Sequence, residues 1–269
     1  MGTPLSYNDV LDKLHKTGEY DKLAAVCKRR ISVLRAKYGD GHIKVGLGLT
    51  ELAYTYYEMQ DYAKSLEALE EAEQMLELHY GRTSRVFATC LIDQARLCIF
   101  LEQYNKADRL LIESTKVEAA LPIEHQDLRP SILINYSKLQ RHEGNLEEAR
   151  QSLQDALEWV LGNLDDKSYY IPRIQHHLGE VYWRQNDLQA AEVALRDSLN
   201  RYQKLLLSHD ADYAMAISLL GIVLGDKGDK EEAISLHQDA LSILKNIRPI
   251  GHPNIRTVSE RILHLNRNA

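Results

Sequence analysis

The feature that most constrains this chain is a repeat of 42 residues. The letters EEA at 147–149 recur at 231–233, and QDAL at 154–157 recurs at 238–241, both at an offset of 84 residues. A period of 42 residues, half of that offset, runs through the whole chain without an insertion. At each step, a polar, turn-like pair of residues precedes one of the equivalent positions Tyr20, Tyr62, Tyr104, Leu146, Leu188 and Lys230. Such a period is typical of proteins built from stacked structural repeats.

Five of the six repeats carry two positions for a small residue, twelve residues apart. The first position holds Ala53, Ala95, Ser137, Gly179 and Gly221, and the second holds Ser65, Ala107, Ala149, Ala191 and Ala233. Apolar residues lie three and four positions away, which predicts one apolar stripe on each of two helices. Small side chains on facing stripes let antiparallel helices approach closely. One such pair cannot bury its own apolar face, so the repeats are expected to stack.

The fifth repeat carries the most specific motif, namely Leu178, Gly179, Tyr182, Ala191, Leu195 and Ser198. This spacing resembles the tetratricopeptide pattern, and the 42-residue period resembles its kinesin-light-chain type. Residues 38–42 (YGDGH) and 250–254 (IGHPN) resemble the Gly-x-x-His-Pro linkers of that type. The resemblance extends from about residue 6 to the end. Gln94 and Gln140 depart from it, because the family has Leu and Tyr there.

The resemblance implies an all-α fold, a right-handed superhelical α-solenoid of antiparallel helix pairs that spans residues 1–269 as a single domain. Six repeats are predicted at about 4–43, 44–87, 88–129, 130–171, 172–213 and 214–253. A last helix, predicted at 254–268, places Val258, Ile262 and Leu265 on one stripe. It is either a solvating cap or the point at which a longer array has been cut.

Composition excludes several classes of function. The net charge of −6 argues against a general nucleic-acid binder. No apolar run approaches the ~18 residues that cross a bilayer. The three cysteines form no CxxC motif, and we expect a reduced, cytoplasmic protein. Gly2 and Ser6 satisfy the short pattern for N-myristoylation, but a helix capping box formed by Ser6 and Asp9 is the preferred interpretation.

No catalytic, cofactor-binding or metal-binding residues are predicted. Residues 221–227 have P-loop spacing, but Asp226 and Gly228 stand where Lys and Ser or Thr are required. His176 and His177 have no second histidine four positions away, as the HExxH zinc motif requires. The sequence therefore predicts a protein that is not an enzyme and needs no cofactor.

The resemblance implies that peptides bind along a concave groove lined by the first helix of each repeat. Positions on the helix face opposite the packing stripe give the candidate peptide-binding residues Tyr54, Tyr57, Arg96, Asn135, Lys138, Arg141, Arg173, His176, Glu180, Trp183 and Arg184. The middle of this set is basic, opposed mainly by Asp93 and Glu180, although the chain is acidic. We predict a protein partner whose acidic segment carries a hydrophobic anchor. The alternative is that the charges are simply solvated and Trp183 packs against a neighbouring helix.

These features favour a non-catalytic protein–protein interaction module, an adaptor or scaffold with no nucleic-acid or membrane partner. Two other interpretations stay open. One is a regulatory protein whose repeats close on a peptide, and the other is a fragment of a larger cargo adaptor similar to kinesin light chains.

Overall fold

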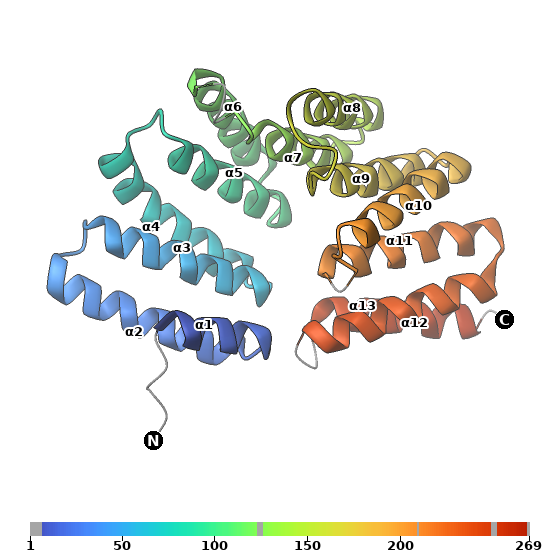
Figure 1. Cartoon of the computed structure of the whole chain (residues 1–269), viewed down its shortest axis with the longest axis horizontal. Helices are drawn as coiled ribbons and strands as arrows, with labels where there is room; N and C mark the ends of the chain where they lie inside the picture. Colours follow the sequence, from blue (N-terminus) through green and yellow to red (C-terminus); the bar gives the residue numbers. More distant parts are fainter. Residues whose placement is uncertain (1–6, 123–125, 209, 249–251, 268–269) are drawn as a thin grey trace. The chain divides into compact units, whose positions relative to one another are not determined.

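The computed structural model describes residues 7–122, 126–208, 210–248 and 252–267, which form thirteen helices and no strand (Figure 1). Gly2 and Ser6, on which the myristoylation pattern and the preferred capping box depend, lie outside these residues. The helices are α1 (Tyr7–Lys16), α2 (Tyr20–Tyr38), α3 (Ile43–Glu58), α4 (Tyr62–Tyr80), α5 (Arg85–Phe100), α6 (Tyr104–Ala120), α7 (Arg129–His142), α8 (Leu146–Asn163), α9 (Tyr170–Arg184), α10 (Leu188–Lys204), α11 (Ala211–Lys227), α12 (Lys230–Ile247) and α13 (Pro253–Arg267). The prediction of an all-α repeat fold is confirmed.

The chain divides into two compact units, Met1–Asn135 and Tyr136–Ala269, here called the N-terminal and C-terminal units. The boundary falls inside α7. Among the described helices, none combines the length and the apolar character needed to span a bilayer.

The same turn joins the two helices of every repeat. One residue in each turn adopts a left-handed conformation, at Gly18, Gln60, Glu102, Gly144, Asn186 and Gly228. The residue after it donates its N–H to a carbonyl five positions back, for example Asp61 to Tyr56 at 2.9 Å and Asp187 to Tyr182 at 2.9 Å. This is the Schellman arrangement, which ends a helix and reverses the chain. The polar pairs seen in the sequence are therefore helix stops placed 42 residues apart.

The small residues lie where the two helices of a repeat touch. Ala53 is buried, and its carbonyl accepts a hydrogen bond of 2.7 Å from Ser65 Oγ, twelve residues later. A Cβ added at Gly179 would lie 2.6 Å from Leu195 Cγ, and one at Gly221 would lie 3.2 Å from the Ala233 carbonyl. The helices thus approach so closely that glycine is favoured at two of these positions.

Both glutamines that depart from the family pattern are accommodated by hydrogen bonds. Gln94 is buried in α5, and its Nε2 donates to Glu73 Oε2 of α4 at 2.7 Å. The Gln140 amide of α7 lies 2.9 Å from Ser152 Oγ of α8. Each polar side chain replaces apolar packing with a bond to the neighbouring helix, which removes the cost of burying it unpaired.

Polar contacts also attach the last helix. His237 of α12 stands where most other repeats have leucine, and its Nδ1 lies 3.2 Å from Ser218 Oγ of α11. Arg261 of α13 donates to the same Ser218 oxygen at 2.8 Å. Around this contact, Val258 and Ile262 pack into the apolar core of α11 and α12. Ser218 and His237 are both buried, so we interpret them as core groups and not as a reactive pair.

The linker histidines act as helix caps. His42 Nδ1 accepts the Lys44 N–H at 3.1 Å at the start of α3, and His252 Nδ1 accepts the Asn254 N–H at 3.2 Å at the start of α13. The two linkers noticed in the sequence therefore serve one local purpose, which is to satisfy an N–H group left open by the first helical turn.

We predict that Gly179→Ala destabilises the C-terminal unit by about 1–3 kcal/mol, because its Cβ overlaps Leu195. The matched control is Gly162→Ala in α8, where an added Cβ meets nothing within 4 Å. Alanine there should stabilise by up to about 1 kcal/mol through helix propensity. Urea denaturation followed by circular dichroism measures both. Equal effects of the two substitutions would contradict the close approach.

Stability should fall below neutral pH because of His237. Burial and then the charge of Arg261 lower its pKa from 6.5 to about 4, so the unfolded chain binds the proton more tightly than the folded one. The stabilisation is therefore complete above about pH 6.5 and is lost as the pH falls toward 4, by roughly 3 kcal/mol. His237→Gln should reduce the dependence of the urea midpoint on pH in this window, with the remaining slope due to other buried histidines whose pKa is lowered, such as His252. An unchanged slope would show that His237 does not titrate as described.

Candidate functional site

The predicted binding residues lie on four first helices and are divided between the two units. Tyr54, Tyr57, Arg96 and Asn135 belong to the N-terminal unit, and the remaining seven candidates belong to the C-terminal unit. Asn135 is buried, and its Oδ1 has no hydrogen-bond partner among the described residues.

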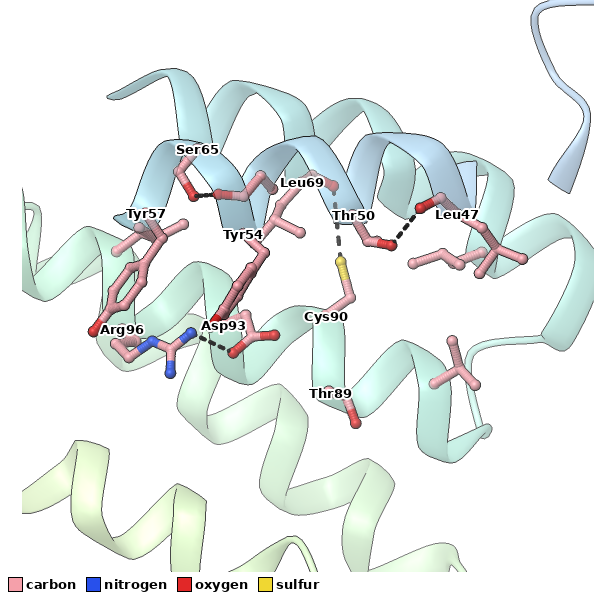
Figure 2. Close-up of a pocket in the computed structure, with 14 residues that line it drawn as sticks. Leu47, Thr50, Tyr54, Tyr57, Ser65, Leu69, Thr89, Cys90, Asp93 and Arg96 are labelled. Atoms are coloured by element: carbon pink, nitrogen blue, oxygen red, sulfur yellow. Dashed lines mark hydrogen bonds and ion pairs between the residues drawn. The ribbon is translucent and has the colours of Figure 1, made fainter. Parts of the chain in front are cut away.

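The N-terminal unit has a pocket of about 160 Å³ between α3 and α5 (Figure 2). Its lining includes Leu47, Tyr54 and Tyr57 from α3 and Val86, Cys90 and Arg96 from α5. In Figure 2, Leu47 lies at one end, and Tyr57 and Arg96 lie at the other. The walls are mostly apolar, and Tyr54 and Leu47 are 50% and 42% exposed, which suits a single apolar side chain of a ligand.

At the polar end of this pocket, the positive charge of Arg96 is neutralised by Asp93. Arg96 Nη2 donates to Asp93 Oδ1 at 2.9 Å, and its guanidinium carbon lies 4.6 Å from the centre of the Tyr57 ring. Nearby, Tyr62 of α4 stacks on Phe100 with ring centres 4.6 Å apart. Arg96 is therefore held by a carboxylate and an aromatic face, and it does not give this pocket a net charge.

In the C-terminal unit, Glu180 of α9 is the centre of an ion-pair cluster. Arg141 of α7 pairs with its Oε2, and Arg184 Nη2 lies 3.2 Å from its Oε1. Burial opposes ionisation of Glu180, but the neighbouring His177 ring and the charge of Arg141 outweigh it and hold the pKa of this carboxyl well below its usual range. Arg141 is itself only 9% exposed. The pair fastens α9 to the C-terminal end of α7.

A second pair lies further along α9. Arg173 Nε is 3.4 Å from Asp212 Oδ2 of α11, and the Tyr169 hydroxyl donates to the same oxygen at 2.7 Å. Burial raises the pKa of Asp212, but the Arg173 charge and the Tyr169 hydrogen bond reverse this and lower it. Asp212 was missed as an opposing charge in the sequence, because nothing in a single repeat shows that it faces Arg173.

His176 and His177 lie between these two pairs. Both Nδ1 atoms are buried and lack a hydrogen-bond partner among the described residues, and His177 Nδ1 is 3.9 Å from Glu180 Oε2, too far for a hydrogen bond. Burial lowers the pKa of both rings, so they are neutral at pH 7.

The two histidines and Glu180 place three ligand atoms within 4.8 Å of one another, a donor set that could hold a metal ion. The segment His176–Glu180 does not have the HExxH spacing, but Glu180 follows His176 by one helical turn and supplies the third ligand atom. However, Arg141 and Arg184 occupy the carboxylate, and the charges of Lys138 and Arg141 also act on His177. These neighbours repel a cation, and the arrangement suits an anion better.

Trp183 is less exposed than a purely solvated side chain would be. It packs against the core formed by Leu219, Leu220 and Val223 of α11, and its indole N–H donates to Asp226 Oδ2 at 2.7 Å. Trp183 therefore packs against a neighbouring helix, as one half of the alternative predicts. Trp183 still lines an open pocket of about 530 Å³ together with Arg141, Gly144, Leu146, Arg184 and Asn186.

Comparison with known proteins supports the pattern read from the sequence. A family model described as "Tetratricopeptide repeat" matches residues 128–204 and 170–246. The two matches together cover residues 128–246 and support the predicted resemblance to tetratricopeptide-repeat proteins over that part of the chain. The chain is 22% identical to rat "Tetratricopeptide repeat protein 23" over 85% of this chain and 55% of the relative, so it spans about half the length of that protein.

Solved structures share the fold. A tetratricopeptide-repeat protein from Parabacteroides merdae has a TM-score of 0.67 at 13% identity, covering 98% of this chain and 86% of its own. A putative kinesin light chain from Podosopora anserina gives 0.53 at 20% identity, covering 75% and 96%. A Rap protein complexed with Competence and Sporulation Factor gives 0.65 at 12% identity, covering 97% and 74%. These likenesses confirm a helical-repeat solenoid, a fold that is typically a non-catalytic interaction module.

The buried ion pair of the C-terminal unit can be tested by a double-mutant cycle. Glu180→Met should cost about 3 kcal/mol, because Arg141 is left buried and uncompensated, whereas Arg141→Met combined with Glu180→Met should recover most of that loss. The exposed pair Arg150–Glu147 serves as the control, and its removal should change the urea midpoint little. Strictly additive losses at 141 and 180 would contradict the coupling.

Proposed function

We propose that this protein is an adaptor or scaffold whose first-helix surfaces bind a partner's peptide segment, acidic in sequence and carrying a hydrophobic anchor. The tetratricopeptide fold supports a protein–protein interaction role in general. The observation that carries the finer proposal is the charge of the C-terminal unit's surface. Lys138, Arg141, Arg173 and Arg184 gather there against Glu180 and Asp212, in a chain whose net charge is −6.

The cations of this surface differ in exposure, and they contribute to binding in different ways. Arg184 retains 41% side-chain exposure, so a ligand carboxylate can reach it directly. Arg141 and Arg173 are more buried and already paired, and they contribute mainly a positive field. Trp183 and Leu146 line the same pocket and supply apolar area for the anchor. His176 contributes a polar ring atom behind this surface.

The pocket between α3 and α5 of the N-terminal unit is the second proposed contact. Its apolar walls and exposed Tyr54 fit a side chain without charge, since Arg96 and Asp93 already neutralise each other. The Rap protein of similar fold is a complex with Competence and Sporulation Factor, which supports a protein or peptide as the class of partner. We place this function in the cytoplasm, because a reducing compartment suits the three free cysteines Cys27, Cys90 and Cys98.

Selection from a displayed random-peptide library tests the proposal. We expect enrichment of acidic segments with a large apolar residue, and at least roughly tenfold weaker binding of the selected peptides to Arg184→Glu and Trp183→Ala. Arg196→Glu on the second helix α10 is the matched control, with the same charge change in the same unit, and it should leave affinity unchanged. Selection without acidic preference, or equal weakening by Arg196→Glu, would overturn the assignment.

A further inference from the structure

Two lysines lie against the exposed side chain of Tyr38, at the point where α2 ends. Lys44 Nζ donates to the Tyr38 hydroxyl oxygen at 3.2 Å and lies 4.5 Å from the centre of the ring. Lys37 Nζ lies 5.1 Å from the same ring centre, and it also bonds to the hydroxyl. His42 stacks on the ring with centres 4.7 Å apart, which restricts the orientation of the tyrosine. Two positive charges therefore meet at one phenol oxygen.

Neither lysine is neutralised by a carboxylate. Within the described part of the chain, no aspartate or glutamate oxygen lies within 4.0 Å of the Nζ of Lys37 or Lys44. Asp40, the nearest carboxylate in the sequence, pairs with Arg35 at 3.9 Å. Hydrogen bonds from Lys44 and then from Lys37 lower the pKa of the Tyr38 hydroxyl, because they favour the ionised oxygen. An anionic group on this oxygen would pair with both ammonium groups.

The equivalent position of the next repeat lacks these cations. Tyr80 follows Tyr38 by 42 residues and is similarly exposed, at 42% against 36%. Among the described residues, no lysine bonds to its hydroxyl. The next cation along the chain, Arg82, is already held by Glu77 at 3.6 Å and by Glu113 at 2.9 Å. The packing of a repeat therefore does not require lysines at this tyrosine.

Two other exposed tyrosines are less suited to carry a negative group. Tyr54 lies within α3, and its hydroxyl is 3.3 Å from His15 Nε2. The Tyr169 hydroxyl donates to the Asp212 carboxylate at 2.7 Å, so an added negative charge there would be repelled. Tyr38 differs from both, because its hydroxyl meets two cations at the end of a helix.

The backbone around Tyr38 is open to an enzyme. α2 ends at Tyr38 and α3 begins at Ile43, and residues 36–41 are exposed without a break. Two glycines, Gly39 and Gly41, lie in the linker, and a Cβ added at either meets nothing within 4 Å. A catalytic cleft can therefore enclose the phenol without displacing a buried side chain.

We propose that Tyr38 is a phosphorylation site, and that Lys37 and Lys44 hold the phosphoryl group once it is attached. The phenol oxygen attacks the γ-phosphorus of ATP bound to a tyrosine kinase. The bond from that phosphorus to the β,γ-bridging oxygen breaks, ADP leaves, and the phenolic proton passes to the catalytic aspartate of the kinase. The attached group carries nearly −2 at pH 7 and three acceptor oxygens, which matches two ammonium groups.

The modification would join two repeats by charge, because Lys37 belongs to α2 and Lys44 to α3. The site lies on the linker between these helices, and the proposal does not depend on the proposed peptide-binding surfaces.

The ionisation of the attached group tests whether the lysines hold it. Full-length chains with phosphotyrosine at position 38 or at position 80 are made by genetically encoded incorporation, and each phosphate is titrated by ³¹P NMR. We expect the second phosphate pKa at position 38 to lie at least about half a unit below that at position 80, because two exposed ammonium groups favour the dianion. Lys37→Gln and Lys44→Gln should each reduce this difference. Equal pKa values at the two positions would overturn the role of the lysines.

Transfer from ATP tests whether Tyr38 is a substrate. A panel of purified tyrosine kinase catalytic domains is incubated with the folded full chain, Mg²⁺ and ATP, and the modified tyrosines are located by mass spectrometry. We expect modification of Tyr38 at least roughly tenfold faster than that of Tyr80. Tyr38→Phe should remove the main product, whereas the matched control Tyr80→Phe should not. Circular dichroism melting checks that both variants are folded. Equal rates at the two tyrosines, or no transfer to Tyr38 by any kinase of the panel, would overturn the assignment.

Discussion

The close approach of two helices within each repeat is the constraint on which the rest of the structure depends. Small residues twelve positions apart, such as Gly179 and Ala191, allow the approach, and a left-handed residue in the turn holds its direction. Where the turn residue is Gln60 or Glu102 instead of glycine, the fold accepts a conformation that costs about 1–2 kcal/mol. The geometry thus outweighs the local preference of the side chain.

A constant repeat length has a second consequence, because it places equivalent positions of successive first helices side by side. Several polar contacts span 42 or 43 residues: Arg85 with Asp127, Tyr169 with Asp212, Trp183 with Asp226, and Ser218 with Arg261. Each joins a residue to its near-counterpart in the next repeat. The surface proposed to bind a ligand is therefore also the surface on which the repeats are fastened to one another, and ligand binding and stability share the same side chains.

The period predicts the helices, their turns and the buried small residues, because all of these follow from local spacing. It also assigns Arg141, Arg173 and Trp183 to the first-helix face. It does not predict that Arg141 is only 9% exposed. It also does not predict that Asp212 pairs with Arg173 or that Asp226 accepts a hydrogen bond from Trp183. Burial and pairing depend on the adjacent repeat. Comparing complementary residues at offsets of 42 and 43 would have found Asp226 for Trp183 and Asp212 for Tyr169. The grouping of His176, His177 and Glu180 does not follow the HExxH spacing, so that motif does not predict it.

Hydrogen exchange of backbone amides, measured with and without a bound acidic peptide, tests most directly whether the first-helix face is the working surface. The account predicts slower exchange at the C-terminal end of α7 and along α9, with α8 and α10 changing little. Uniform slowing throughout both units would indicate instead a regulator that tightens as a whole. Protection confined to the second helices α8 and α10 would contradict the central claim.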